Sequence, residues 1–267
     1  EKFWINHQSF LQSRGYLLRP RYRSGWVPSW TLPDANFDPE QSNIYEFKRD
    51  NVLDAIRVSD GSKVILKRVR TWTDEIRLGV YFSSEKLLQD PHNRTYHLLD
   101  VIPLSDDDAF AIIVMPFLRE FDSPVFRYLS DIVDAMRSYC FPESTKTIAQ
   151  GFKFMHAHNV AHRDACALNL MMDCTRVIPQ SFHFSAPWTQ DGVNYGVQSR
   201  QWIITSLISA SPERTRVLGV FGQDKTVPEL SDIVPYNPFK VDIYQLGNVF
   251  SELITVASCS SLCHALF

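Results

Sequence analysis

The chain has no long apolar run, no strong excess of either charge and no repeated or low-complexity segment. Nowhere do about 18 apolar residues follow one another, so the sequence predicts no membrane-spanning helix. Lys and Arg number 27 against 30 Asp and Glu, a net charge of −3, which argues against a general nucleic-acid binder. The first residues, Glu1 to Trp4, include no initiating Met and no signal-peptide pattern, so we expect the sequence to begin within a longer protein.

Cysteine is scarce, and the spacing of the cysteines suggests neither a disulfide framework nor a metal site. There are five cysteines, and an odd number of them argues weakly against a set of disulfides. Cys259 and Cys263 lie near His264, but this spacing does not complete a four-ligand metal site. We therefore expect reduced thiols in an intracellular protein, cytoplasmic or nuclear.

What the chain does have is the composition and pattern of a globular α+β protein. Its 267 residues are 45% hydrophobic and 21% charged, enough to bury a sizeable core. Residues 54–58 and 63–69 read as two strands joined by a Gly-containing turn, and 110–115 reads as an apolar strand. Asp106 to Asp108 resembles a solvated hairpin turn. Ile148, Phe152 and Met155 share one face of a predicted helix.

The most informative motif follows that helix. His162, Arg163 and Asp164, with Asn169 five residues after the Asp, match H-R-D-x-x-x-x-N, the catalytic-loop signature of protein kinases. In that signature the Asp accepts the proton of the attacking hydroxyl and the Asn binds the metal ion that bridges the phosphates. The motif makes these four residues our candidate catalytic and metal-binding set.

Upstream residues resemble other parts of a kinase nucleotide site. Residues 63–69 are similar to the V-A-I-K strand, with Lys67 as the phosphate-binding lysine. Met115 takes the place of the gatekeeper at the end of its strand. Phe117 and Leu118 lie in the hinge, whose backbone would hold adenine.

Downstream residues also resemble the kinase pattern. Residues 227–229 (Val-Pro-Glu) resemble the Ala-Pro-Glu that closes an activation segment. The stretch from Val241 resembles the start of the central C-lobe helix, in which Asp242 braces the catalytic loop. This helix is apolar on nearly every face, which predicts that it is buried.

A closer resemblance covers nearly the whole chain. The sequence is similar to the protein-kinase-like family abundant in basidiomycete fungi, and the segments that carry the similarity are 14–22, 25–30, 169–173 and 235–242. The resemblance implies a bilobal kinase fold with an N-terminal extension (1–42), an N-lobe and hinge (43–118) and a C-lobe (119–267). Because the chain stops soon after the central helix, we expect an incomplete C-lobe with an exposed apolar patch.

Three departures from the kinase pattern weaken the expectation of activity. The stretch equivalent to the Gly-rich loop, residues 45–50, has no glycine, although only glycine lets the backbone approach phosphates closely. No D-F-G occurs, since 205–207 reads Thr-Ser-Leu and 181–183 reads Ser-Phe-His; Asp173 or Asp191 could replace its carboxylate only in a rearranged loop. Cys166 stands where many Ser/Thr kinases carry a lysine.

Several alternatives stay open. Either Glu75 or Glu85 would pair with Lys67. The residues around Glu75 resemble the family pattern, whereas Glu85 has the more usual spacing from Lys67. If active, the protein would use ATP and Mg²⁺ to phosphorylate Ser or Thr hydroxyls of a protein substrate. The alternative is a pseudokinase that binds a partner protein, with nucleotide or with no cofactor at all.

Overall fold

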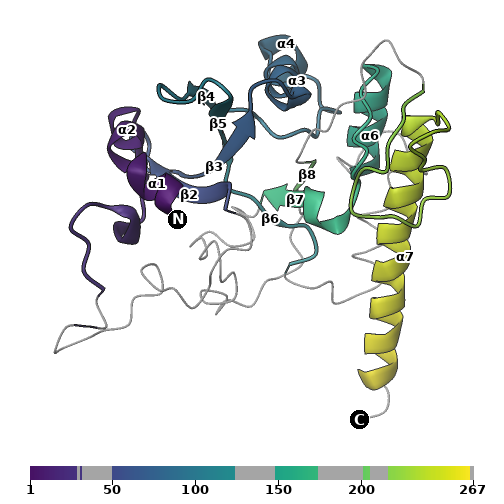
Figure 1. Ribbon diagram of the computed structural model, residues 1–267. Coiled ribbons are helices and arrows are strands. Elements are labelled where there is room, and N and C mark those ends of the chain that lie inside the picture. Colours follow the sequence, from purple (N-terminus) through teal and green to yellow (C-terminus); the bar gives the residue numbers. More distant parts are fainter. Residues whose placement is uncertain (29–30, 32–49, 124–147, 174–200, 205–215, 265–267) are drawn as a thin grey trace. The chain divides into compact units, whose positions relative to one another are not determined.

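The computed structural model describes residues 1–28, 31, 50–123, 148–173, 201–204 and 216–264, which Figure 1 draws as coloured ribbon and loops. Within them the protein is a mixed α+β structure with a five-stranded antiparallel sheet, a three-stranded sheet and several helices. The chain divides into two compact units. The described parts of the first lie within Glu1–Trp72 and Leu98–Phe117, and those of the second lie within Thr73–His97, Leu118–Asp173 and Arg200–Phe267.

The first unit is built on the five-stranded sheet, in the order β1-β2-β3-β5-β4. Its strands are β1 (Tyr16–Leu18), β2 (Val52–Arg57), β3 (Lys63–Arg70), β4 (Asp100–Pro103) and β5 (Phe110–Pro116). The predicted strands at 54–58, 63–69 and 110–115 are therefore confirmed. So are the two turns: Gly61 has φ +71° between β2 and β3, and the Phe110 amide bonds to the Asp107 carbonyl before β5.

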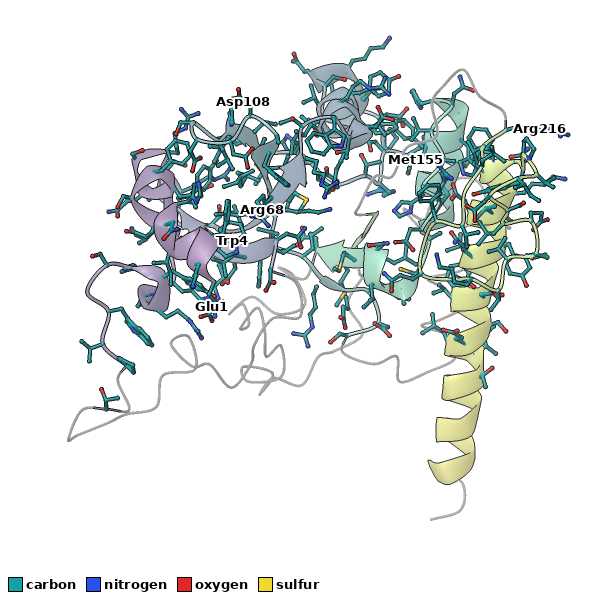
Figure 2. The ribbon with its side chains drawn as sticks, in the orientation of Figure 1. Glu1, Trp4, Arg68, Asp108, Met155 and Arg216 are labelled. Atoms are coloured by element: carbon teal, nitrogen blue, oxygen red, sulfur yellow. The ribbon has the colours of Figure 1, made fainter. Side chains whose placement is uncertain are left out.

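Two short N-terminal helices, α1 (Lys2–Asn6) and α2 (Gln8–Ser13), pack on this sheet. Trp4 is 2% exposed and donates its indole N–H to the Asp50 carbonyl at 3.1 Å. The Arg68 guanidinium lies over the rings of Phe3 (4.5 Å) and Phe110 (5.1 Å); Trp4 and Arg68 are labelled in Figure 2. These aromatic and cation–π contacts join α1 to strand β3, the strand that carries Lys67.

Tyr16 on strand β1 adds a pH-dependent contribution to the stability of this unit. Its hydroxyl donates to Asp100 at 3.0 Å, and burial, together with that carboxylate, raises the pKa of Tyr16 to about 12. Because the unfolded chain would ionise near pH 10, this contribution is complete below that pH. It is lost as the pH rises from about 10 to about 12.

The second unit contains the longer helices and the three-stranded sheet. Helices α3 (Asp74–Phe82) and α4 (Glu85–Leu88) precede α6 (Ile148–Ala157) and α7 (Pro238–His264) in the chain. The sheet pairs β6 (Arg119–Glu120), β7 (Leu170–Asp173) and β8 (Gln201–Ile204), and the 3-10 helix η5 (Ala167–Asn169) leads into β7. The predicted helix from residue 148 is thus confirmed, with Phe152 1% and Met155 0% exposed on one face; Met155 is labelled in Figure 2.

Helix α7 runs beside α6 in Figure 1, and the His156 ring contacts Phe239 at 4.9 Å between ring centres. Asn237 caps α7 by accepting the Phe239 amide at 2.9 Å, and Pro238 suits the first helical position because it needs no amide partner.

The expectation that α7 is buried on nearly every face is wrong. Val241, Leu246, Val249 and Phe250 are at most 6% exposed, whereas Ile243, Tyr244 and Ile254 are 39–45% exposed. The buried residues recur at helical spacing on one stripe, and among the described residues the opposite face is left largely uncovered. An exposed apolar surface was expected on this part of the chain, and these three side chains provide it.

Among the described helices, none is long and apolar enough to cross a membrane.

Candidate active site

The catalytic-loop motif begins where helix α6 ends. The Val160 amide bonds to the Met155 carbonyl at 2.9 Å and the Asn159 amide to the His156 carbonyl at 2.9 Å. Asn159 has φ +58°. This pattern is a Schellman motif with asparagine at the left-handed position, which ends the helix and redirects the backbone. Val160 and Ala161 are buried, and this burial fixes the backbone directly before His162.

Asp242 of α7 holds the backbone of the motif through its side-chain carboxylate. Its side chain is fully buried and accepts the backbone amide of His162 at 2.8 Å and that of Arg163 at 2.6 Å. His156 of α6 lies 2.8 Å from the same carboxylate. The predicted bracing of this backbone by Asp242 is confirmed, and its role as a catalytic loop stays a prediction. One carboxylate fixes two consecutive amides, including that of Arg163, whose φ of +64° is strained for a residue with a side chain.

A second residue of α7 continues this support. The Gln245 side chain is 1% exposed and accepts the Ala165 amide at 2.9 Å. Asp242 and Gln245 are three residues apart on one helix face, so together they hold the backbone on both sides of Asp164.

The motif's candidate base and candidate metal ligand, Asp164 and Asn169, lie together. The Asn169 amide nitrogen is 2.8 Å from the Asp164 carbonyl and 2.9 Å from the Asp164 Oδ2 atom. The Gln223 backbone amide donates to Asp164 Oδ1 at 2.7 Å. Asp164 is 8% and Asn169 3% exposed. An ionised carboxylate offers about four lone-pair positions, and these contacts use one on each oxygen. The carboxylate therefore retains lone pairs for a further hydrogen-bond donor.

Arg163 connects this loop to the segment that precedes α7. Its guanidinium donates to the Leu218 carbonyl at 3.0 Å and to the Tyr236 hydroxyl at 3.2 Å. The ring of Phe221 lies 4.3 Å from the guanidinium carbon, and the Tyr236 hydroxyl donates in turn to the Gly219 carbonyl. Arg163 is therefore a buried residue of the motif that also joins it to the segment before α7.

Gly222 allows the segment to approach the loop closely. Its φ is +81°, and a Cβ atom there would lie 2.6 Å from the Arg163 carbonyl and 3.2 Å from Asp164 Oδ1. Contacts this short exclude a side chain, because the opposing atoms belong to backbone and to a fixed carboxylate. Glycine is required both by the backbone conformation and by the space.

Cys166 contributes no charge to the site. Burial, and secondly the neighbouring Asp164 carboxylate, raise the pKa of the Cys166 thiol to about 11. The thiol is therefore neutral at physiological pH, and it is a free cysteine. The positive charge that a lysine would bring two residues after the Asp is absent here.

The residues present fit a magnesium ion only in part. The side-chain oxygen of Asn169 suits such an ion, which also favours carboxylates. Asp173 lies at the far end of β7, paired with Gln201, and a strand of this length places it about 10 Å or more from Asn169. No group of three or more His, Cys, Asp or Glu side chains suited to a metal occurs within the described part of the chain. Asp173 therefore does not replace the missing carboxylate.

The nucleotide-binding candidates are distributed over both units. Lys67 is half-buried on β3, opposite Val52 and Ile113, and it belongs to the first unit. Met115 and Phe117 end the described part of that unit, and Leu118 begins the next stretch of the second. The Lys63 ammonium lies 5.5 Å from the Phe117 ring centre.

The two candidate partners of Lys67 lie on different helices of the second unit. Glu75 is half-buried in the first turn of α3, and its charge contributes, after burial, to raising the pKa of the buried Tyr96. Glu85 is exposed in the first turn of α4. The choice between them stays a prediction.

Several predicted features lie outside the described residues. These are the D-F-G equivalents at 205–207 and 181–183, Asp191, and all but Asp50 of the stretch equivalent to the Gly-rich loop.

Sequence reasoning missed the residues that hold the loop in place, namely His156, Gly222, Gln223, Tyr236 and Gln245. For Gln245 a signal was available, since it follows Asp242 by three residues on the same predicted helix. Nothing in the sequence pairs residues 218–223 with Asp164, because the contact is made through backbone atoms.

A scan against protein-family models found no match, and a search of curated proteins found none either.

Proposed function

We propose that this chain is a bilobal protein-kinase-like domain that binds ATP and transfers its γ-phosphoryl group, at a low rate, to Ser or Thr hydroxyls of a protein substrate. Asp164 accepts the proton of that hydroxyl in this proposal. Lys67 contacts the phosphates, Glu75 orients Lys67, and residues 115–118 hold the adenine. Asn169 would bind Mg²⁺, which neutralises charge on the phosphates when it is present.

One observation carries the proposal. The four motif residues form a single hydrogen-bonded loop in which Asp164, Asn169 and the amides of His162 and Arg163 are all fixed. A general base must be held in one orientation to act, and a solvated acid on a surface loop needs none of these contacts. The element order agrees, since β3 with Lys67 is followed by two helices and strand β4, and residues 115–118 come at the end of β5 and directly after it.

The low rate follows from what the sequence lacks. Without a glycine in residues 45–50, the backbone there cannot cover the phosphates as a Gly-rich loop does. With no D-F-G, the metal-binding carboxylate that acts beside the Asn is missing from its usual place. Each loss removes charge stabilisation from the transferring phosphoryl group, while the base itself is kept.

The second candidate is a pseudokinase that binds a partner protein. It is favoured by the same loop, because Asp164 is 8% exposed and each of its oxygens already accepts a hydrogen bond from the protein. A carboxylate used in this way can serve the architecture alone.

The proposal is tested by phosphoryl transfer from γ-labelled ATP to a panel of Ser- and Thr-containing peptides, with the wild type and Asp164→Asn. We expect slow transfer by the wild type and a loss of about 100-fold or more in the variant, the usual contribution of a general base. Asp173→Asn is the matched control, since Asp173 lies away from the motif at the end of β7, and its rate should equal that of the wild type. Equal rates in wild type and Asp164→Asn would refute the role of Asp164. No transfer by the wild type would favour the pseudokinase.

A further inference from the structure

The segment Leu218–Gln223, called here the 218–223 loop, touches the candidate base directly. The Gln223 amide donates to Asp164 Oδ1 at 2.7 Å, and the Gly222 backbone lies against the Arg163 carbonyl. A hydroxyl approaching Asp164 Oδ1 would have to share that oxygen with Gln223. The 218–223 loop therefore controls access to one side of the carboxylate.

The loop is attached at both ends by contacts of its own. The Gly219 amide bonds to the Ser231 carbonyl at 2.8 Å, and Val217 pairs with Tyr236 through two bonds of 2.9 Å. After the loop, Asp224 accepts the Asn248 side chain of α7 at 2.8 Å. Residues 217–236 thus close on themselves and on α7, and the loop between these attachments rests on Arg163.

Arg163 holds the loop through neutral groups. Its guanidinium donates to the Leu218 carbonyl and the Tyr236 hydroxyl, and Phe221 covers its face at 4.3 Å. A cation between an aromatic face and carbonyl oxygens is stabilised without an anion. A phosphate added to the segment is consequently not needed to neutralise Arg163 or to order the loop.

The 218–223 loop is also weakly packed, which lets it open locally. Leu218, Val220 and Phe221 are 42–49% exposed, so the loop buries little apolar surface. Segments with few buried contacts open at a small fraction of the global unfolding free energy.

We propose that the 218–223 loop is a latch over Asp164, held closed by the stacking of Phe221 on Arg163 and independent of phosphorylation. Opening the latch frees Asp164 Oδ1 from Gln223, and closing it fixes the carboxylate. The inference rests on the proposed function only for its purpose, since the contacts themselves involve no nucleotide.

Hydrogen exchange tests the latch without measuring activity. The wild type, shown by mass to be unphosphorylated, should protect the amides of Gly219 and Gln223. In Phe221→Ala these two amides should exchange at least about tenfold faster, while amides of α6 and α7 keep their wild-type rates. Phe221→Leu, which keeps the apolar bulk but not the ring, should also exchange faster. Ile233→Ala is the control, because Ile233 is 86% exposed in the same segment, and its exchange should match the wild type.

Two results would overturn the latch. One is wild-type protection of Gly219 and Gln223 in both Phe221 variants. The other is an unphosphorylated wild type in which these amides are unprotected. Neither result bears on ATP binding or transfer, so failure of the latch and failure of the proposed function can be told apart.

Discussion

Asp242→Ala is expected to lower the free energy of unfolding by about 3–5 kcal/mol, the usual cost of removing one partner from a buried charged network. Asp242 is fully buried and accepts two backbone amides and the His156 ring. Without the carboxylate, the amides of His162 and Arg163 are left buried with no acceptor from α7, and each unsatisfied group adds to the loss. Chemical denaturation of the purified variants measures the effect.

Asp232→Ala is the matched control, because Asp232 is an exposed acid a few residues before α7, and we expect a change within about 0.5 kcal/mol. Asp242→Asn retains one oxygen acceptor and should fall between the two. If Asp242→Ala unfolds at the same denaturant concentration as Asp232→Ala, α7 does not brace the loop in the way described.

Gly222→Ala should cost at least about 2 kcal/mol of stability or detach the 218–223 loop. A side chain at φ +81° costs about 1–2 kcal/mol in backbone strain, and the added Cβ would lie 2.6 Å from the Arg163 carbonyl. Because a backbone oxygen cannot rotate away as a flexible side chain can, either the loop or the catalytic motif must move. Thermal unfolding reports the first outcome, and exchange of the Gln223 amide reports the second.

Gly247→Ala provides the opposite control on helix α7. A Cβ there meets nothing within 4 Å, and alanine is the better helix former by about 0.5–1 kcal/mol, so this variant should be slightly more stable than the wild type. The pair separates a glycine required by close approach from one that is not. A Gly222→Ala protein with wild-type stability and a protected Gln223 amide would contradict the contact.

Features set by local patterns could be predicted from the sequence. Strands β2, β3 and β5 follow from apolar runs bounded by turn residues, and α6 follows from the spacing of Phe152 and Met155. The bracing role of Asp242 followed from the resemblance, and its bonds to the loop are present. In each case the information lies in side chains at short range or in a recognisable motif.

Features set by tertiary packing could not be predicted from the sequence. The residues around Asp242 in α7 are apolar on nearly every face, yet Ile243 and Tyr244 are exposed, because hydrophobicity alone does not say which faces find partners. The contact of Gln223 with Asp164 uses a backbone amide, which every residue except proline possesses. No pattern of residue types could therefore have predicted this contact.

Nucleotide binding at Lys67 is tested most directly by a thermal-unfolding titration with ATP, with and without Mg²⁺, on the wild type and Lys67→Ala. Ligand that binds only the folded state stabilises it by about 2.7 kcal/mol at 100 times its dissociation constant. We expect ATP to stabilise the wild type, more strongly with Mg²⁺, and we expect this stabilisation to be lost in Lys67→Ala. An unchanged melting temperature for the wild type under every condition would contradict a nucleotide-binding kinase-like domain.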